Sequence, residues 1–92
     1  MNKEIAKSIL NEKLSVYREK SYVELLELLA VQETLEVPVD SGEKFQIEVQ
    51  AFRDDEAGGD LRVAISIDDG GLRVFSPITD DFIITPDGEL FG

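Results

Sequence analysis

Residues 44–68, KFQIEVQAFRDDEAGGDLRVAISID, contain two runs in which every second residue is apolar. Successive side chains of a β-strand point to opposite faces, so a period of two predicts a strand with one buried face. Between the runs lies DDEAGGD, whose glycine and aspartate tolerate the backbone angles of a chain reversal. We therefore predict an antiparallel hairpin whose buried face carries Phe45, Ile47, Val49, Ala51, Leu61, Val63, Ile65 and Ile67.

The alternation extends in both directions from this hairpin. Residues 34–39, TLEVPV, predict a preceding strand, and Pro38 favours the edge of the sheet because it has no backbone N–H to donate. A two-residue turn at Asp69 and Gly70 predicts a following strand. The register of that turn keeps apolar residues opposite apolar residues, namely Ile67 opposite Leu72 and Ile65 opposite Val74.

The last predicted reversal lies in residues 82–92, FIITPDGELFG. Pro86 fixes its own backbone angle, Asp87 is expected to accept a hydrogen bond across the turn, and Gly88 suits the left-handed position. These residues indicate a short terminal hairpin, with residues 76–81, SPITDD, as the link that leads into it. Apolar residues fall on both of its faces: Phe82, Ile84 and Leu90 on one, Ile83 and Phe91 on the other.

Ahead of the strands, the apolar residues recur every three or four positions, which is typical of amphipathic helices. Residues 2–20 predict a first helix with Asn2 as its N-cap. Ser21 and Glu24 have the S-x-x-E spacing of a capping box, which predicts the start of a second helix. The apolar stripes of the two helices are Ile5, Ile9, Leu10, Leu14 and Tyr17, followed by Leu25, Leu26, Leu28 and Leu29.

Together these elements predict an α+β fold in a single domain, residues 1–92. Two N-terminal helices are expected to pack on one face of an antiparallel meander of four strands, which a short C-terminal hairpin completes.

Composition excludes several classes of chemistry. The 92 residues include no cysteine and no histidine, so disulfides, thiolate nucleophiles, Cys/His zinc sites and imidazole catalysis are not available. The net charge is −11, and residues 21–92 hold most of it, with four basic and seventeen acidic groups. Such a field repels nucleic acid and anionic lipid and favours basic partners or cations. We expect no cofactor.

The sequence also bears on location. No apolar run approaches the roughly 18 to 20 residues that a membrane helix needs, so we expect no membrane span. Residues 1–14 are interrupted by charges, unlike the apolar core of a secretory signal. We therefore expect a cytoplasmic protein.

Aspartates in the predicted turns are the candidate metal ligands. Alternate turns of a meander lie at the same end, so the loop at 54–60 and the link at 76–81 should be neighbours. Oxygen-rich clusters bind calcium or magnesium, and paired carboxylates can hold divalent ions for phosphoryl hydrolysis. Solvated turn residues are nevertheless the favoured interpretation, because the spacing matches no known calcium loop. The candidates are Asp54, Asp55, Asp60, Asp80 and Asp81, with Glu56 beside them.

The sheet face away from the helices should be mostly polar, but Phe52 and Phe75 interrupt that pattern. The predicted register brings Phe75 opposite Ala64, with Phe52 near the same end. Apolar groups here need a cover, for which the terminal hairpin is the favoured interpretation and a second copy in a homodimer or a partner are the alternatives. We expect a small acidic interaction protein, adaptor or inhibitor-like and not an enzyme, that binds a basic protein. The partner-binding candidates are Phe52, Phe75, Asp54, Asp55, Asp80 and Asp81.

Three stretches of the chain carry a resemblance. These are SYVELLELL at 21–29, GGDLRVAISIDDGG at 58–71 and FSPITDDFIITPDGELFG at 75–92. With the order of elements, they make residues 21–92 similar to a family of small bacterial proteins of unknown function. The resemblance implies a bacterial protein and assigns no site residue.

Overall fold

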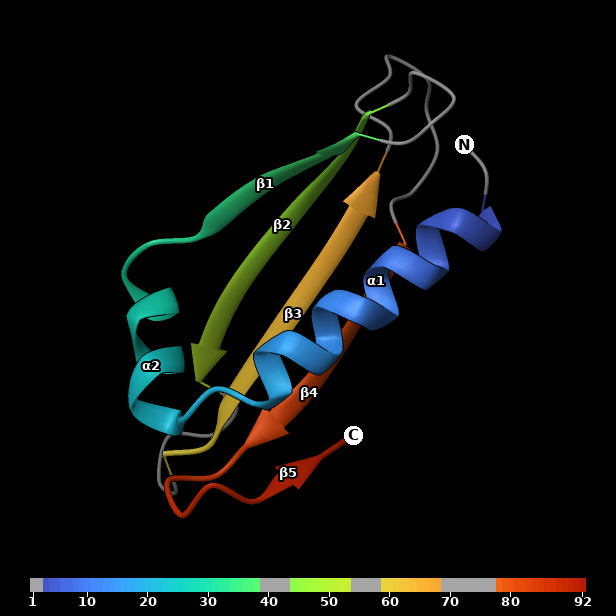
Figure 1. The fold of residues 1–92 in the computed structure, drawn as a ribbon. Coiled ribbons are helices and arrows are strands. Elements are labelled where there is room, and N and C mark those ends of the chain that lie inside the picture. The colour runs from blue at the N-terminus through green and yellow to red at the C-terminus, as the bar shows by residue number, and fades with distance from the viewer. Residues whose placement is uncertain (1–2, 39–43, 54–58, 69–77) are drawn as a thin grey trace.

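The computed structural model describes residues 3–38, 44–53, 59–68 and 78–92 (Figure 1). Two helices, one turn of 3-10 helix and five strands follow one another along the chain. In order they are α1 (Lys3–Arg18), α2 (Tyr22–Leu26), η1 (Glu27–Leu29), β1 (Glu33–Pro38), β2 (Lys44–Arg53), β3 (Leu61–Asp68), β4 (Ile78–Ile84) and β5 (Leu90–Phe91).

Helix α1 forms where the four-residue period predicted it. Glu4 in the first turn and Arg18 in the last turn suit the helix dipole. The predicted cap Asn2 lies outside the described residues. The predicted apolar stripe of α1 is confirmed at Leu10, Leu14 and Tyr17, but it is wrong at Ile5, which is 40% exposed while its neighbour Ala6 is buried. The buried residues of α1 are Ala6, Leu10, Leu14 and Tyr17.

Helix α2 begins with the predicted capping box. The backbone N–H of Glu24 donates to Ser21 Oγ at 3.1 Å, and the backbone N–H of Ser21 donates to Glu24 Oε1 at 3.2 Å. After one and a half turns the chain tightens into η1. Leu25 and Leu28 are buried against the sheet, which is what the predicted leucine stripe requires.

The sheet is a meander in which each strand pairs antiparallel with the next, in the order β1-β2-β3-β4-β5. Exposure alternates along β2, as the period of two predicted. The predicted β2–β3 hairpin is confirmed, with Ile47 opposite Ile67 and Val49 opposite Ile65. The first strand, which contains Pro38, lies at the edge as predicted.

The partner of β3 on its other side corrects the sequence prediction. Ile67 lies opposite Ile78, and Ile65 lies opposite Asp80. The pairing of these two isoleucines with Leu72 and Val74 is therefore wrong. The predicted strand around 72–75 falls in residues 69–77, outside the described part of the chain.

The terminal hairpin between β4 and β5 is confirmed. The backbone N–H of Gly88 donates to the carbonyl of Thr85 at 2.8 Å, and Gly88 has a φ of +89°. That left-handed angle strains any residue with a Cβ, so glycine is required there. The backbone N–H of Glu89 also donates to Thr85 Oγ1 at 3.1 Å, which adds a second contact across the turn. Within the hairpin, Ile83 lies opposite Phe91 and Ile84 opposite Leu90.

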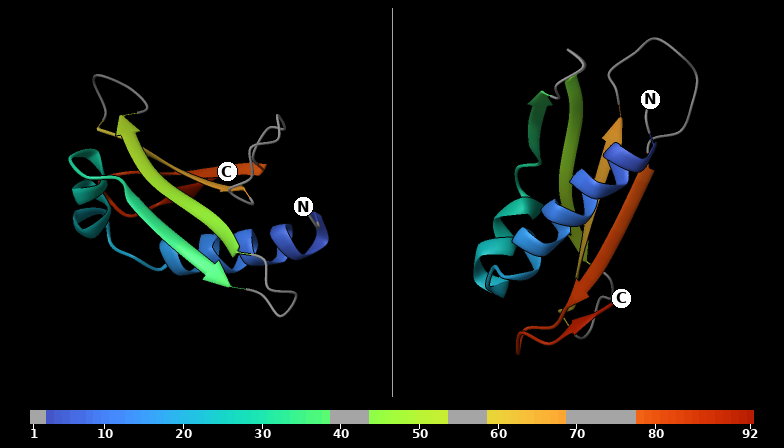
Figure 2. Two further views of the ribbon diagram at one scale, coloured as in Figure 1. Left: turned by 90° about the horizontal axis from the view of Figure 1, so that it is seen from above. Right: turned by 45° about the vertical axis from the view of Figure 1, so that its right-hand side comes forward.

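Both helices lie on one face of the sheet (Figure 2). Helix α1 packs across β3 and β4, and η1, which continues α2, packs against β2. One core cluster joins them to the inner face of the strands. Among the described residues, no charged side chain is buried, and the buried Tyr17 carries a polar hydroxyl into this cluster. The opposite sheet face, which we call the open face, has no helix against it in the described part of the chain.

Candidate interaction surface

Of the six acidic residues that the sequence placed in neighbouring turns, the structure describes Asp60, Asp80 and Asp81. Asp80 and Asp81 belong to strand β4, not to a link at 76–81. Asp60 lies directly before β3. Its neighbour Leu61 pairs with Ile84, which is three residues beyond Asp81 in β4. Asp54, Asp55 and Glu56 lie outside the described residues. Within the described ranges, no group of three or more carboxylates is placed to hold a metal ion.

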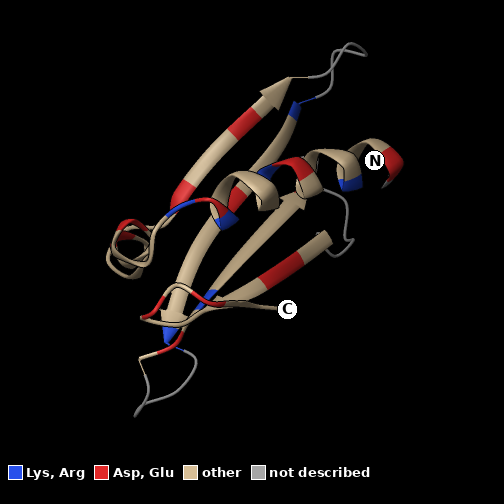
Figure 3. Cartoon of the chain, turned by 60° about the horizontal axis from the view of Figure 1, so that its bottom comes forward, with Lys and Arg blue, Asp and Glu red and all other residues tan. Residues whose placement is uncertain are grey.

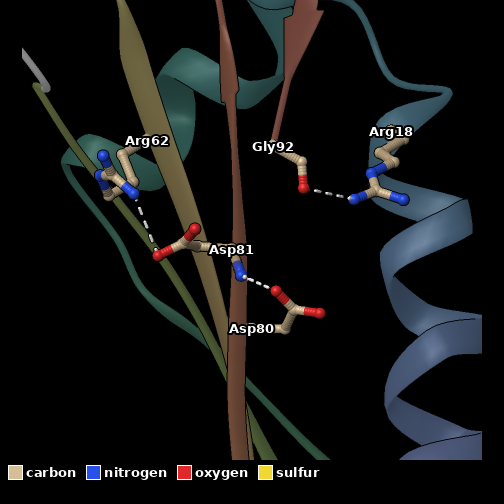
Figure 4. A network of polar contacts seen from close by, with 5 residues as sticks. All are labelled: Arg18, Arg62, Asp80, Asp81 and Gly92. Carbon is tan, nitrogen blue, oxygen red and sulfur yellow. Dashed lines mark hydrogen bonds and ion pairs between the residues drawn. The ribbon is translucent and has the colours of Figure 1, made fainter.

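Asp80 and Asp81 point to opposite sides of β4 (Figure 4). Asp81 reaches over the open face and forms an ion pair with Arg62, with its Oδ2 3.1 Å from the guanidinium. Asp80 lies toward α1, and its Oδ1 accepts a hydrogen bond from the backbone N–H of Asp81 at 2.8 Å. Two carboxylates held on opposite faces cannot bind the same ion through their side chains. These aspartates therefore do not form a metal pair.

The open face carries a row of four residues, one from each of four neighbouring strands. Phe52 lies opposite Arg62, Arg62 opposite Ile83, and Ile83 opposite Phe91. Phe52 is 46% exposed and Phe91 is 53% exposed. We call this set the Phe52–Phe91 row. It places two exposed aromatic rings on a single line across the sheet, with a cation between them.

The remainder of the open face is polar. Ser66 and Thr79 lie opposite each other, with their hydroxyl oxygens 3.1 Å apart. The exposed side of β2 adds Gln46, Glu48 and Gln50. Ala64 lies between Gln50 and Asp81, so the predicted pairing of Ala64 with Phe75 is wrong, and Phe75 itself is outside the described residues. The Phe52–Phe91 row is thus a band of three apolar residues and one arginine at one end of a polar face.

A second feature lies at the edge formed by α2, η1 and β1. Residues 21–43 contain six acidic residues and no lysine or arginine. Figure 3 shows the acidic positions along α2 and β1. Between these elements is a groove of about 440 Å³, lined by Glu24, Glu27, Leu28, Ala30, Val31 and Glu33. We call it the η1–β1 groove.

One wall of this groove is tied to the first helix. The hydroxyl of Tyr17 donates to Glu33 Oε2 at 2.6 Å, which joins α1 to the start of β1. Burial of the phenol, and then its hydrogen bond to Glu33, raise the pKa of Tyr17 well above its usual range. The phenol therefore stays protonated and holds the Glu33 carboxylate in place.

We predict that Tyr17→Phe lowers the free energy of unfolding by about 1 kcal/mol at neutral pH, because it removes this hydrogen bond and keeps the ring. Folding also raises the Tyr17 pKa, so the wild type should lose stability as the pH rises above the ordinary tyrosine value of about 10. The variant should lose less over the same range. Urea unfolding at pH 7 and pH 10.5 measures both effects. Equal alkaline losses in the two proteins would contradict the assignment.

Another groove, of about 430 Å³, lies between the α1–α2 junction and the β4–β5 turn. Its charged residues have both signs: Arg18 and Lys20 beside Glu19 and Asp87. Arg18 also lies over the Phe82 ring at 5.7 Å and donates to the carbonyl of Gly92 at 3.4 Å. These contacts join the end of α1 to β4 and to the residue that follows β5.

The comparisons with known proteins add no relative. No family model, curated protein or solved structure matches this chain. Among the described residues, no helix is both long enough and apolar enough to cross a membrane. The fold and surface thus define a two-layer α+β domain with an open sheet face and an acidic edge.

Sequence reasoning identified part of this surface. It placed Phe52 outward and put Ile83 and Phe91 on the same side of the last hairpin. It missed the row as a unit because the row depends on the β3–β4 register. It also missed the η1–β1 groove, although the run of acidic residues without a base in 21–43 was a usable signal.

Proposed function

We propose that this protein is a small acidic interaction module, an adaptor or inhibitor-like protein that binds a basic protein partner. In this proposal it is a cytoplasmic bacterial protein and not an enzyme, and its partner is a protein rather than nucleic acid or a membrane.

The Phe52–Phe91 row is the observation that carries the proposal. Binding energy at protein interfaces concentrates in a few aromatic and arginine residues that lose contact with water. The row offers two half-exposed phenylalanines with Arg62 and Ile83 between them, on a face that no described helix covers. A partner that covers this band would remove its apolar area from water.

Charge gives the sign of the partner. The chain has a net charge of −11, so it would attract a basic protein at long range and repel an acidic one. Two acidic residues of the open face contribute to this negative charge, namely Glu48 near its centre and Glu36 on the edge strand. Attraction of this kind raises the association rate and weakens with salt.

Affinity capture tests the proposal. The tagged protein is mixed at low and high salt with a lysate of the cells that naturally contain it, and retained proteins are identified by mass spectrometry. We expect a stoichiometric basic protein whose retention falls at high salt. The proposal fails if retained proteins are acidic, or if basic proteins are retained equally by an unrelated protein of the same net charge.

A homodimer through the open face is the second candidate, and the same row favours it. A second copy would bury the two phenylalanines equally well, but two chains of charge −11 repel each other. Light scattering over a hundredfold range of concentration separates the cases. A constant monomer mass supports a different partner. A dimer that Phe52→Asp converts to a folded monomer supports the second candidate.

The divalent-metal or metal-dependent hydrolase alternative gains no observation from the described residues, since Asp80 and Asp81 point apart. A titration with Mg²⁺, Mn²⁺ and Ca²⁺ tests this alternative directly when the chemical shifts of the backbone amides are recorded. Saturable shifts confined to the aspartates would support it, and weak drift throughout the spectrum would exclude it.

A further inference from the structure

The η1–β1 groove combines an apolar floor with an acidic rim. Val31 is 70% exposed at its mouth, while Leu28 is only 5% exposed and forms part of its base. Ala30 completes the apolar lining. Three glutamates, Glu24, Glu27 and Glu33, stand around these residues, and the lining includes no basic side chain.

Two of the three carboxylates are already held in position. Glu24 accepts the backbone N–H of Ser21 within the capping box, and Glu33 accepts the Tyr17 hydroxyl. The bond from the Ser21 backbone, followed by the one from its side chain, holds the pKa of Glu24 below its usual range. A carboxylate can accept several hydrogen bonds, so both can still receive one from a ligand. Little side-chain freedom remains to be lost on binding.

The shape and charge of the groove fit a long cationic side chain. The aliphatic stem of lysine or arginine packs on apolar surface while its charged end remains at a polar rim. Leu28 and Val31 provide the surface for the stem, and the glutamates provide acceptors for the head. A carboxylate or phosphate ligand would be repelled. A purely aliphatic one would bring no cation to the three carboxylates, of which Glu24 already feels the charge of Lys20, a residue outside the groove lining.

We propose that the η1–β1 groove binds a lysine or arginine side chain of a basic peptide segment in the partner. This inference deepens the proposed function and rests on it: it names the edge of α2, η1 and β1 as a second contact beside the Phe52–Phe91 row.

The test uses the full-length ¹⁵N-labelled protein and a capped hexapeptide of alternating lysine and glycine. We expect saturable amide shifts centred on Leu28, Ala30 and Val31. A peptide with acetylated lysines keeps the stems and loses the charges, and it should bind about two- to fivefold more weakly, the range expected when an exposed ion pair in the groove is lost.

Matched variants separate the groove from general charge attraction. Glu27→Gln removes a rim carboxylate, and Glu36→Gln removes one carboxylate from β1 outside the groove. We expect Glu27→Gln to weaken binding about two- to fivefold and Glu36→Gln to leave it within error. Val31→Ser should weaken it by a similar factor through lost apolar contact, whereas Val23→Ser, at an equally exposed valine of α2, should not.

Each outcome decides between the two proposals. Selective loss in Glu27→Gln and Val31→Ser, with shifts at the groove, supports the inference. Equal loss in Glu27→Gln and Glu36→Gln, with shifts spread over all acidic segments, overturns the groove and leaves the proposed function standing. Capture of a basic partner whose affinity is the same for wild type and Val31→Ser also overturns only the groove. If neither peptide nor basic protein binds, both proposals fail.

Discussion

Phe45→Ala should lower the free energy of unfolding by about 3 to 5 kcal/mol, the range found when a buried phenylalanine is truncated. Phe45 is fully buried on the inner face of β2 and belongs to the single core cluster. Truncation removes its apolar contacts and leaves a cavity that its neighbours fill only in part. A domain of this size is stable by about 5 to 14 kcal/mol, so the loss is a large share of the total.

Phe52→Ala is the matched control, because it makes the same change on the same strand but on the open face. Phe52 is 46% exposed, so we expect a loss below about 1 kcal/mol. Urea unfolding followed by circular dichroism gives both values. Similar losses at the two positions would contradict the assignment of the inner and open faces of the sheet.

The second large effect concerns the corrected β3–β4 register. Ser66 and Thr79 lie opposite each other on the open face, and their hydroxyl oxygens are 3.1 Å apart. The double variant Ser66→Cys/Thr79→Cys should therefore form an intrachain disulfide on mild oxidation. The closed loop is close to the 15-residue loop for which chain entropy gives about 3 kcal/mol, so we expect a gain of about 2 to 3 kcal/mol over the reduced form.

The chain itself contains no cysteine, so no other thiol competes in this experiment. The control is Ser66→Cys/Arg73→Cys, the pair that the register predicted from sequence would place opposite each other. Mass spectrometry after oxidation reports the bond, and unfolding under oxidised and reduced conditions reports its effect. The structure is contradicted if the second pair gains stability on oxidation and the first does not.

Much of the fold was predictable because the spacing of the apolar residues changes along the chain, from every three or four residues in the helices to every second residue in the strands. The four-residue spacing of α1, the Ser21–Glu24 capping box and the alternation in β2 and β3 each indicate a local structure that the tertiary fold also needs. The turn at Gly88 follows from the same kind of local rule. These elements agree with the structure because no long-range choice is involved.

The partner of β3 required such a choice, and the local rule gave the wrong answer. Leu72 and Ile78 are both apolar and both offer an acceptable partner for Ile67. The two-residue hairpin at Asp69 and Gly70 closes the shorter loop, so it costs less chain entropy. The alternation of apolar residues cannot distinguish the two registers, because each places an apolar residue opposite Ile67. Asp80 and Asp81 were assigned to a link for a related reason, since a strand around 72–75 leaves residues 76–81 as the connection to the last hairpin.

The candidate surface was predictable only in part. The outward position of Phe52 follows from its parity along β2, because side chains alternate between the two faces of a strand. The η1–β1 groove does not follow from any single element, since its lining comes from α2, from η1 and the two residues after it, and from the first residue of β1. How closely those walls approach depends on the packing of Tyr17 and Leu28, which sequence pattern does not specify.

The most direct test of the proposed function is the affinity of a captured basic partner for the wild type and for Phe52→Ser/Phe91→Ser. Both positions are about half exposed, so the double variant should stay folded. Titration calorimetry at low and high salt should show binding to the wild type that weakens with salt, and affinity at least about tenfold lower for the variant at either salt concentration. Equal affinities for the two proteins would contradict the role of the Phe52–Phe91 row and with it the central claim.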